Sequence, residues 1–99
     1  KVPHIQHLQA CDNRIEKNWC LCGSLCTTAD VLVRDVTLQG LREGDYLAFN
    51  NCGAYSVTEG IHLFLSRTMP LILLRTAENE YIVAREMQES YPINTIQNY

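Results

Sequence analysis

Two short runs of the chain combine residue types that can take part in proton transfer and hydrogen bonding. Residues 23–30 read Gly-Ser-Leu-Cys-Thr-Thr-Ala-Asp and carry the thiol of Cys26. Residues 53–56 read Gly-Ala-Tyr-Ser and carry the phenol of Tyr55. A thiol that is protonated at neutral pH can donate a proton, and a phenol is a neutral hydrogen-bond donor with a rigid apolar body. Because each run follows an apolar segment, we expect both groups to lie in loops, where scaffolds place reactive groups.

The residue types that bind metal ions are present without the spacing of a metal site. Five cysteines stand at positions 11, 20, 22, 26 and 52, and no two have the Cys-x2-Cys spacing of a zinc ribbon. Their odd number, in a chain without a secretion signal, argues against a disulfide framework. We predict no metal ion and, for the cysteines other than Cys26, the role of small buried apolar side chains; a metal site is the alternative. We expect structural or solvent-facing roles for His4, His7 and His62.

Strand signals dominate the segments that must position the first run. Apolar and β-branched stretches predict strands over residues 2–8, 17–23 and 31–36, and a buried strand over residues 46–49. The stretch 39–45 between the last two has turn composition and ends in Gly44-Asp45.

The second half of the chain contains a β-hairpin and one ambiguous segment. Residues 70–75 and 80–85 are apolar runs on either side of a four-residue turn, which predicts the hairpin. In residues 56–66, Val57, Ile61 and Leu65 have helical spacing, so a short helix or irregular turn and an extended segment both stay open. The tail after Met87 is polar, and we expect a loop or a short docking segment there.

Length and strand pattern together indicate one small all-β domain. A chain of 99 residues with 46% hydrophobic content fits a single globular core. Five to seven short strands with frequent turns predict a barrel or a sandwich, and the pattern alone does not choose between the two.

Charge and hydropathy exclude several classes of partner. The net charge is −3 and the eight lysines and arginines are scattered, so we expect no nucleic-acid partner. No apolar run approaches the roughly 20 residues of a membrane-spanning helix, and no basic amphipathic segment indicates a membrane surface. We therefore expect no membrane partner and a cytoplasmic location. The chain begins with Lys1 and lacks a signal-peptide pattern, so we expect a piece of a longer protein.

The two runs and the text between them resemble the C-terminal domain of diaminopimelate decarboxylase and its relatives, the fold-type III pyridoxal-phosphate decarboxylases. The family pattern reads roughly Gly-Pro-x-Cys-Glu-Ser-x-Asp, then an acidic and apolar stretch, then Gly-Asp, then Gly-Ala-Tyr. The same pieces occur here in the same order, at residues 23–30, 31–38, 44–45 and 53–55. The resemblance covers most of the chain, from near Trp19 to near Met87. It implies that residues 1–99 form the Greek-key-like β-barrel that follows a (β/α)8 barrel in these enzymes.

The resemblance also implies a cofactor and roles for two side chains. Pyridoxal 5′-phosphate would be held mainly by a lysine of the preceding barrel, because neither Lys1 nor Lys17 sits in a matching pattern. Cys26 matches the cysteine that is assigned as proton donor to the α-carbon, reaching the active site of the other subunit of a homodimer. Tyr55 matches the tyrosine that supplies its hydroxyl to the cofactor phosphate or to the substrate.

Three positions bear on the substrate. Thr27 stands where diaminopimelate decarboxylases have Glu and ornithine decarboxylases have Asp, the contact for the charged far end of the substrate. Thr27 cannot supply a charge, which puts the usual diamino substrate in doubt. Ser24 replaces the usual proline, and Asp30 keeps the acidic position of the family. Asp30 could contact the substrate or could cap its own turn.

The resemblance predicts one half of a composite active site. The full-length enzyme would decarboxylate a small amino acid, as in lysine biosynthesis, and the isolated domain would be inactive. A non-catalytic β-barrel module for binding or assembly is the alternative from another class. A carboxynorspermidine or arginine decarboxylase domain is a third reading.

Overall fold

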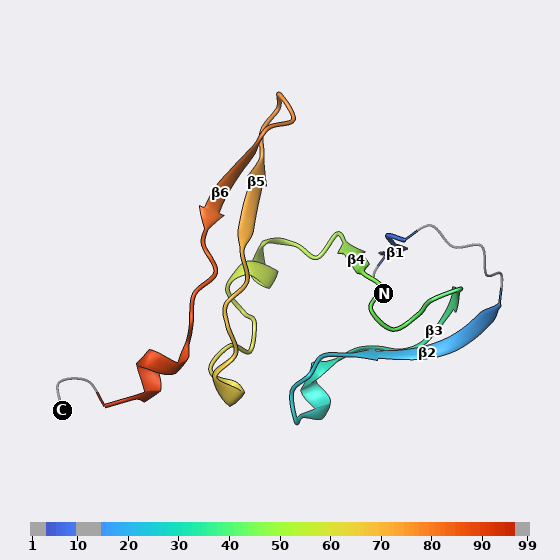
Figure 1. Ribbon diagram of the computed structural model, residues 1–99, viewed down its shortest axis with the longest axis horizontal. Coiled ribbons are helices and arrows are strands. Elements are labelled where there is room, and N and C mark those ends of the chain that lie inside the picture. Colours follow the sequence, from blue (N-terminus) through green and yellow to red (C-terminus); the bar gives the residue numbers. More distant parts are fainter. Residues whose placement is uncertain (1–3, 10–14, 97–99) are drawn as a thin grey trace. The chain divides into compact units, whose positions relative to one another are not determined.

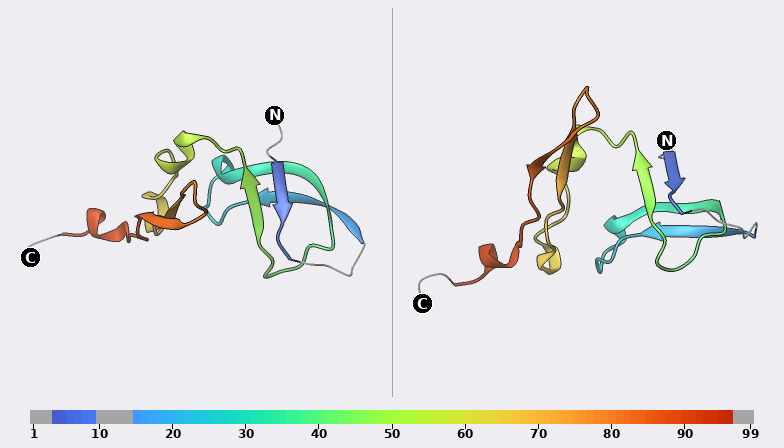
Figure 2. Two further views of the ribbon diagram at one scale, coloured as in Figure 1. Left: turned by 90° about the horizontal axis from the view of Figure 1, so that it is seen from above. Right: turned by 45° about the horizontal axis from the view of Figure 1, so that its top comes forward.

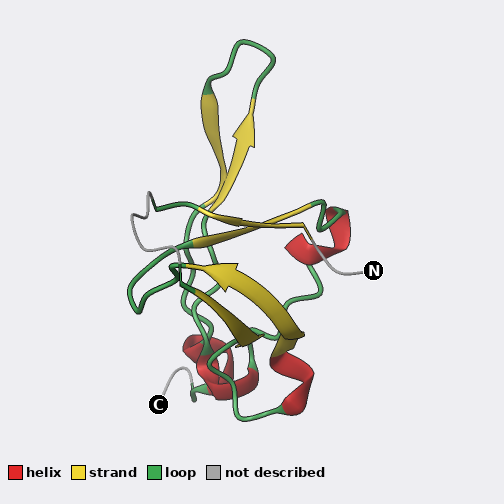
Figure 3. Cartoon of the chain, turned by 90° about the vertical axis from the view of Figure 1, so that its right-hand side faces the viewer, coloured by secondary structure: helices red, strands yellow, loops and turns green. Residues whose placement is uncertain are grey.

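The computed structural model describes residues 4–9 and 15–96, and these residues form strands and short 3-10 turns (Figures 1 and 3). Six strands pair as three antiparallel two-stranded sheets, in which β1 pairs with β4, β2 with β3 and β5 with β6. The chain divides into two compact units, Lys1–Gly53 and Ala54–Tyr99. The predictions of an all-β chain and of at least five strands are confirmed. Within the described residues the strands do not close a barrel.

The longest element of the first unit is the hairpin of β2 (Glu16–Cys22) and β3 (Val31–Gln39). Its register joins Glu16 to Gln39 at one end and Cys22 to Val31 at the other, and it shifts on either side of Leu21. Side chains alternate along β2 as strand geometry requires, so that Trp19 and Leu21 are half-buried while their neighbours are exposed. β3 is longer than the predicted 31–36 because its pairing with β2 continues through Thr37 and Leu38 to Gln39, the first residue of the expected turn.

The first unit also contains the pair formed by β1 (His4–His7) and β4 (Leu47–Asn50). Their register runs from His4 opposite Asn50 to His7 opposite Leu47. This pair crosses the β2–β3 hairpin (Figure 2). The predicted strand is present, but β4 is half-buried along its whole length rather than buried. The first two residues of the predicted strand 2–8 lie outside the described residues.

One carboxylate ties the end of β1 to the turn before β4. Asp45 Oδ2 accepts a hydrogen bond from the backbone amide of Arg42 at 3.0 Å and lies 2.8 Å from His7 Nε2. Gly44, which precedes it, has φ +92°, a region that favours glycine. The hydrogen bond from the Arg42 amide, and then the contact with His7, lower the pKa of Asp45 from its ordinary value of 3.8. The histidine prediction of a structural role is confirmed at His7.

The second unit contains the predicted hairpin, formed by β5 (Ile72–Arg75) and β6 (Tyr81–Arg85). The turn closes through Thr76 N, which donates to Glu80 O at 2.8 Å. Beyond the strands, Met69 and Gln88 exchange backbone hydrogen bonds of 2.7 and 3.2 Å, which extends the pairing.

The ambiguous segment of the second unit contains two 3-10 turns, η2 (Ala54–Val57) and η3 (Phe64–Ser66). The irregular-turn alternative therefore holds, and the helical spacing does not produce an α-helix. Gly60 interrupts the stripe and weakens a helix by about 1 kcal/mol. Leu65 has φ 58°, a left-handed conformation in which a right-handed helix cannot continue. In the tail, η4 (Tyr91–Asn94) forms a further single turn.

A buried serine joins the tail of the second unit to this segment. Ser90 has no exposed surface, and its Oγ lies 2.7 Å from Arg67 O and 3.2 Å from His62 O. Because a hydroxyl has a single proton, the shorter contact is the principal hydrogen bond. No helix in the described residues is long and apolar enough to cross a membrane.

The exposure of the cysteines and of many apolar side chains is where the structure differs most from the sequence-based predictions. Cys20, Cys22 and Cys52 are exposed, so the prediction of small buried side chains is wrong for these three, while Cys11 lies outside the described residues. Apolar side chains on both faces of the β5–β6 hairpin are also exposed, among them Leu73 and Leu74. A two-stranded sheet covers neither of its own faces, so these side chains need another surface to be buried.

The Asp45 contact generates a prediction about pH. Because the folded state lowers the pKa of Asp45, the ionised carboxylate stabilises the fold above pH 3.8, and this contribution is lost as the pH falls through the lowered pKa. We expect His7→Ala to raise the pKa of Asp45 only part of the way to 3.8, because the stronger Arg42 amide contact remains. An NMR titration of the Asp45 carboxyl carbon measures this shift.

His4→Ala is the control, because His4 bonds to Asn50 rather than to Asp45. A full return of the Asp45 pKa to 3.8 in His7→Ala would contradict the stated order of the two causes, and no change at all would show that His7 does not contribute.

Candidate functional site

Cys26 lies at the tip of the β2–β3 hairpin. The connection between the two strands runs through bends at residues 24–27 and then through η1 (Thr28–Asp30). Cys26 is exposed, and the residues on either side of it, Leu25 and Thr27, are half-buried. The loop therefore turns its neighbours inward and leaves the thiol accessible, as a proton donor to a bound molecule requires.

Hydrogen bonds within the tip hold it closed. Gly23 N donates to Asp30 O at 2.8 Å, directly above the last strand pair of the hairpin. The side chain of Asp30 turns into the loop, where its Oδ2 accepts from Leu25 N at 3.0 Å. The half-buried Asp30 thus caps its own loop, as one of the two alternatives from the sequence analysis expected.

Thr27 is the N-cap of η1. Its backbone is extended, with φ −151° and ψ 142°, and its Oγ1 accepts from Ala29 N at 3.2 Å. Its carbonyl accepts from Asp30 N at 3.2 Å. Threonine suits an N-cap because its short side chain places an oxygen at a backbone amide that has no partner within the turn.

Tyr55 lies in η2 of the second unit, shortly after β4 ends. Its carbonyl accepts from Thr58 N at 3.1 Å and Glu59 N at 2.8 Å, which fixes the backbone of the turn. Its side chain is 74% exposed. Gly53, two residues earlier, has φ +80° and turns the chain in a conformation that other residues rarely adopt. Cys26 belongs to the first unit and Tyr55 to the second.

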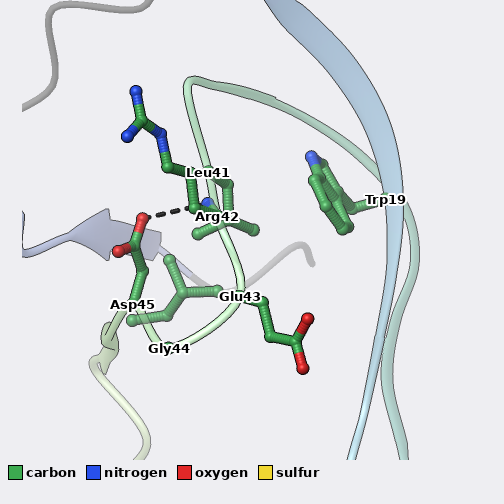
Figure 4. A pocket seen from close by; sticks show the side chains of 7 residues that line it. Trp19, Leu41, Arg42, Glu43, Gly44 and Asp45 are labelled. Atoms are coloured by element: carbon green, nitrogen blue, oxygen red, sulfur yellow. Dashed lines mark hydrogen bonds between the residues drawn. The ribbon is translucent and has the colours of Figure 1, made fainter.

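The first unit also has a pocket of about 490 Å³ that contains none of the predicted site residues (Figure 4). One wall is the ring of Trp19 on β2, and the other is the turn that Asp45 closes. Trp19 Nε1 is buried and makes no hydrogen bond within the described part of the chain. The Gly44-Asp45 turn was visible in the sequence, but its position opposite Trp19 depends on how the strand pairs cross. The pocket is lined by Trp19, Leu41, Arg42, Glu43, Gly44, Asp45 and Leu47.

Metal ligands do not gather anywhere in residues 4–9 and 15–96: no group of three or more Cys, His, Asp or Glu side chains could hold an ion there. His4 bonds to the Asn50 side chain at 3.0 Å, a structural role of the kind expected. His62 Nε2 is buried without a partner among the described residues, in the wall of an apolar pocket of about 370 Å³. Lys17, the one lysine that the structure describes, is exposed on β2.

Comparison with known proteins finds a family and a curated relative that match parts of the chain. The C-terminal sheet domain of pyridoxal-dependent decarboxylases matches residues 2–53, which include Cys26, Thr27 and Asp30 but not Tyr55. The 2-[(L-alanin-3-ylcarbamoyl)methyl]-2-hydroxybutanedioate decarboxylase of Staphylococcus aureus (strain NCTC 8325 / PS 47) is 39% identical over 62 residues, which are 61% of this chain. The aligned part is 16% of that protein's length. No solved structure matches the chain significantly.

Proposed function

Because the chain belongs to the pyridoxal-dependent decarboxylases, whose C-terminal sheet domain its residues 2–53 match, we propose that it completes the active site of an amino-acid decarboxylase. The observation that carries this proposal is the exposed thiol of Cys26 at the tip of a hairpin inside the matched region. The parent enzyme would be a carboxy-lyase, and this domain alone would be inactive because it lacks the cofactor lysine.

The family uses pyridoxal 5′-phosphate. The described residues of this chain could contact the cofactor but include no lysine suited to bind it covalently. Lys17 is exposed on β2, near the end of the hairpin that is opposite to the Cys26 loop. Tyr55 is exposed, and its hydroxyl could donate to a phosphate oxygen. When bound, the cofactor supplies the electron sink that stabilises the carbanion left by loss of carbon dioxide.

In this proposal Cys26 is the acid that protonates the α-carbon after carbon dioxide has left. The thiol needs to be accessible and held in place, and both conditions are met at the hairpin tip. The Tyr55 hydroxyl would face the same cofactor, as a contact to its phosphate or to the substrate. Thr27 and Asp30 would line the site while they cap the loop.

We further propose that residues 1–99 form the Greek-key-like β-barrel of a longer cytoplasmic enzyme, beside an N-terminal barrel that binds the cofactor. The exposed apolar side chains of the β5–β6 hairpin support this reading, because an isolated small domain rarely leaves such groups uncovered. A homodimer would bring Cys26 into the active site of the partner subunit. A non-catalytic β-barrel module for binding or assembly is the competing function, and the first experiment below separates the two.

The motif pattern favours a diaminopimelate-like α-amino acid as substrate, with a role in lysine biosynthesis. Thr27, however, favours a substrate whose far end differs from that of diaminopimelate. A carboxylate at this position would attract an ammonium group and repel an anion. The Staphylococcus aureus relative is named for a substrate with an alanyl group at one end and a hydroxybutanedioate at the other. We therefore propose an amino acid whose far end carries no ammonium group and is either uncharged or anionic.

Cys26→Ala in the full-length enzyme tests the proposed acid. We expect turnover to fall by about 10²–10⁴-fold, the usual contribution of a general acid, while the bound cofactor keeps its absorbance spectrum. Cys22→Ala, which removes an exposed thiol from the adjoining strand, is the matched control and should retain wild-type turnover. A Cys26→Ala enzyme with normal rate and normal product stereochemistry would show that another group is the acid.

Tyr55→Phe tests the proposed cofactor contact. Loss of a hydrogen bond to a charged phosphate oxygen should raise the dissociation constant of pyridoxal 5′-phosphate by about tenfold or more. The measurement is a fluorescence titration of the apoenzyme, with Tyr81→Phe as control because Tyr81 is similarly exposed on β6. If Tyr55→Phe changes only the KM for the substrate, then the hydroxyl contacts the substrate; if it changes neither constant, Tyr55 has no role at the site.

A substrate panel tests the role of Thr27. We expect meso-diaminopimelate to be a poorer substrate than amino acids whose far end lacks an ammonium group. Thr27→Asp keeps the N-cap and adds a charge, so it should shift the ratio of kcat/KM values toward diaminopimelate by about tenfold. Thr27→Ser keeps the cap without the charge and is the control. Diaminopimelate as the best substrate, with activity unchanged in Thr27→Ala, would refute this assignment.

A further inference from the structure

The glycine that opens the Cys26 loop is required for space rather than for backbone conformation. Gly23 is not among the glycines with positive φ, which in the described residues are Gly40, Gly44 and Gly53. A Cβ built on Gly23 would instead overlap the carboxylate of Asp30, at Cγ and both oxygens. The Asp30 carboxylate therefore occupies the volume that a side chain at position 23 would need.

The Asp30 carboxylate cannot leave this space without breaking the loop. Its Oδ2 accepts the Leu25 amide at 3.0 Å, and its own carbonyl accepts the Gly23 amide at 2.8 Å. Because the same carboxylate fills this space and accepts the Leu25 amide, we expect that displacing it weakens or breaks that hydrogen bond. Any residue larger than glycine at position 23 thus costs the Leu25–Asp30 hydrogen bond, and loss of the carboxylate costs the same bond.

Both backbone neighbours of Cys26 are fixed by hydrogen bonds to the residues that follow it. On one side Leu25 N is held by the Asp30 carboxylate. On the other, Thr27 accepts the Ala29 and Asp30 amides. The thiol itself is exposed. A loop anchored on both sides of one accessible side chain determines the direction in which that side chain points.

We infer that Gly23 and Asp30 act together as one positioning pair, in which the carboxylate fills the space above the glycine and holds the backbone that presents Cys26. Neither residue has to touch the substrate. The catalytic part of this inference rests on the proposed function of Cys26; the structural coupling of the pair does not.

A double-mutant cycle on the full-length enzyme tests the pair, with Gly23→Ala, Asp30→Ala and the combined variant. Each single substitution should lower kcat by up to about 10²-fold, because an acid displaced by about 1 Å loses its alignment. The KM of Gly23→Ala and the cofactor content of all three variants should stay at wild-type values. The combined variant should be no slower than Asp30→Ala. Without the Asp30 carboxylate, the methyl group of an alanine at position 23 has room and causes no further displacement.

Hydrogen exchange provides a readout that needs no turnover. In both single variants the Leu25 amide should exchange about tenfold faster or more, and the combined variant should match Asp30→Ala. Asp30→Asn keeps an oxygen in the same place and should preserve slow exchange, while Asp35→Ala removes the same charge from an exposed position on β3 and should match wild type. Mass spectrometry of a peptide that covers residues 23–30 measures these rates.

Two results would overturn the inference: effects that add in the combined variant, or Leu25 exchange that stays at the wild-type rate in either single variant. If Cys26→Ala retains full turnover, the proposed acid is wrong, and the exchange rates still decide whether Gly23 and Asp30 form a pair. If the exchange rates behave as expected but kcat is unchanged in all three variants, the pair closes the loop without positioning a catalytic group, and the catalytic part is overturned.

Discussion

Val33 is the one apolar side chain that is buried in the described part of the chain, and this shortage of interior constrains the rest of the structure. Ordering a residue costs about 1–2 kcal/mol of backbone entropy, which small domains offset mainly by burying apolar surface. In the described residues the strands pair only in twos, so much of the surface of each sheet stays exposed. A chain of this kind needs further protein surface to complete its core, which agrees with membership in a family whose sheet domain is one part of a larger enzyme.

Local hydrogen bonds make up for the missing interior at the places where the chain turns. At the β2–β3 tip, Asp30 and Thr27 satisfy backbone amides that no strand partner reaches. At the turn before β4, Asp45 does the same for Arg42 and also reaches His7 on β1. In the second unit the Ser90 hydroxyl instead donates to the carbonyl of Arg67. At the β2–β3 tip these bonds lie within one loop, so the geometry of that loop depends little on distant packing, whereas Asp45 and Ser90 also join segments that are far apart in the sequence.

This arrangement suits a domain that completes a site held mainly by another part of the enzyme. The tip of the hairpin keeps its shape through bonds inside residues 23–30, while the Cys26 thiol stays exposed. Tyr55 is likewise exposed on a turn that its own carbonyl organises. Side chains presented in this way can meet a cofactor that the domain does not itself bind, and in the proposed enzyme both would do so.

The strands, the β5–β6 hairpin and the family could be predicted from the sequence, because alternation, β-branched runs and turn residues act locally. Burial could not: Cys20 and Cys22 were expected inside, yet they project from the uncovered face of β2, which only the pairing of the sheets reveals. The segment around Ile61 had helical spacing, but a glycine and a left-handed Leu65 interrupt it. The sequence by itself determined which residues lie at the hairpin tip. The tertiary structure alone decided why Gly23 is a glycine, because the carboxylate that fills its space comes from seven residues further along the chain and reaches it only when the loop closes.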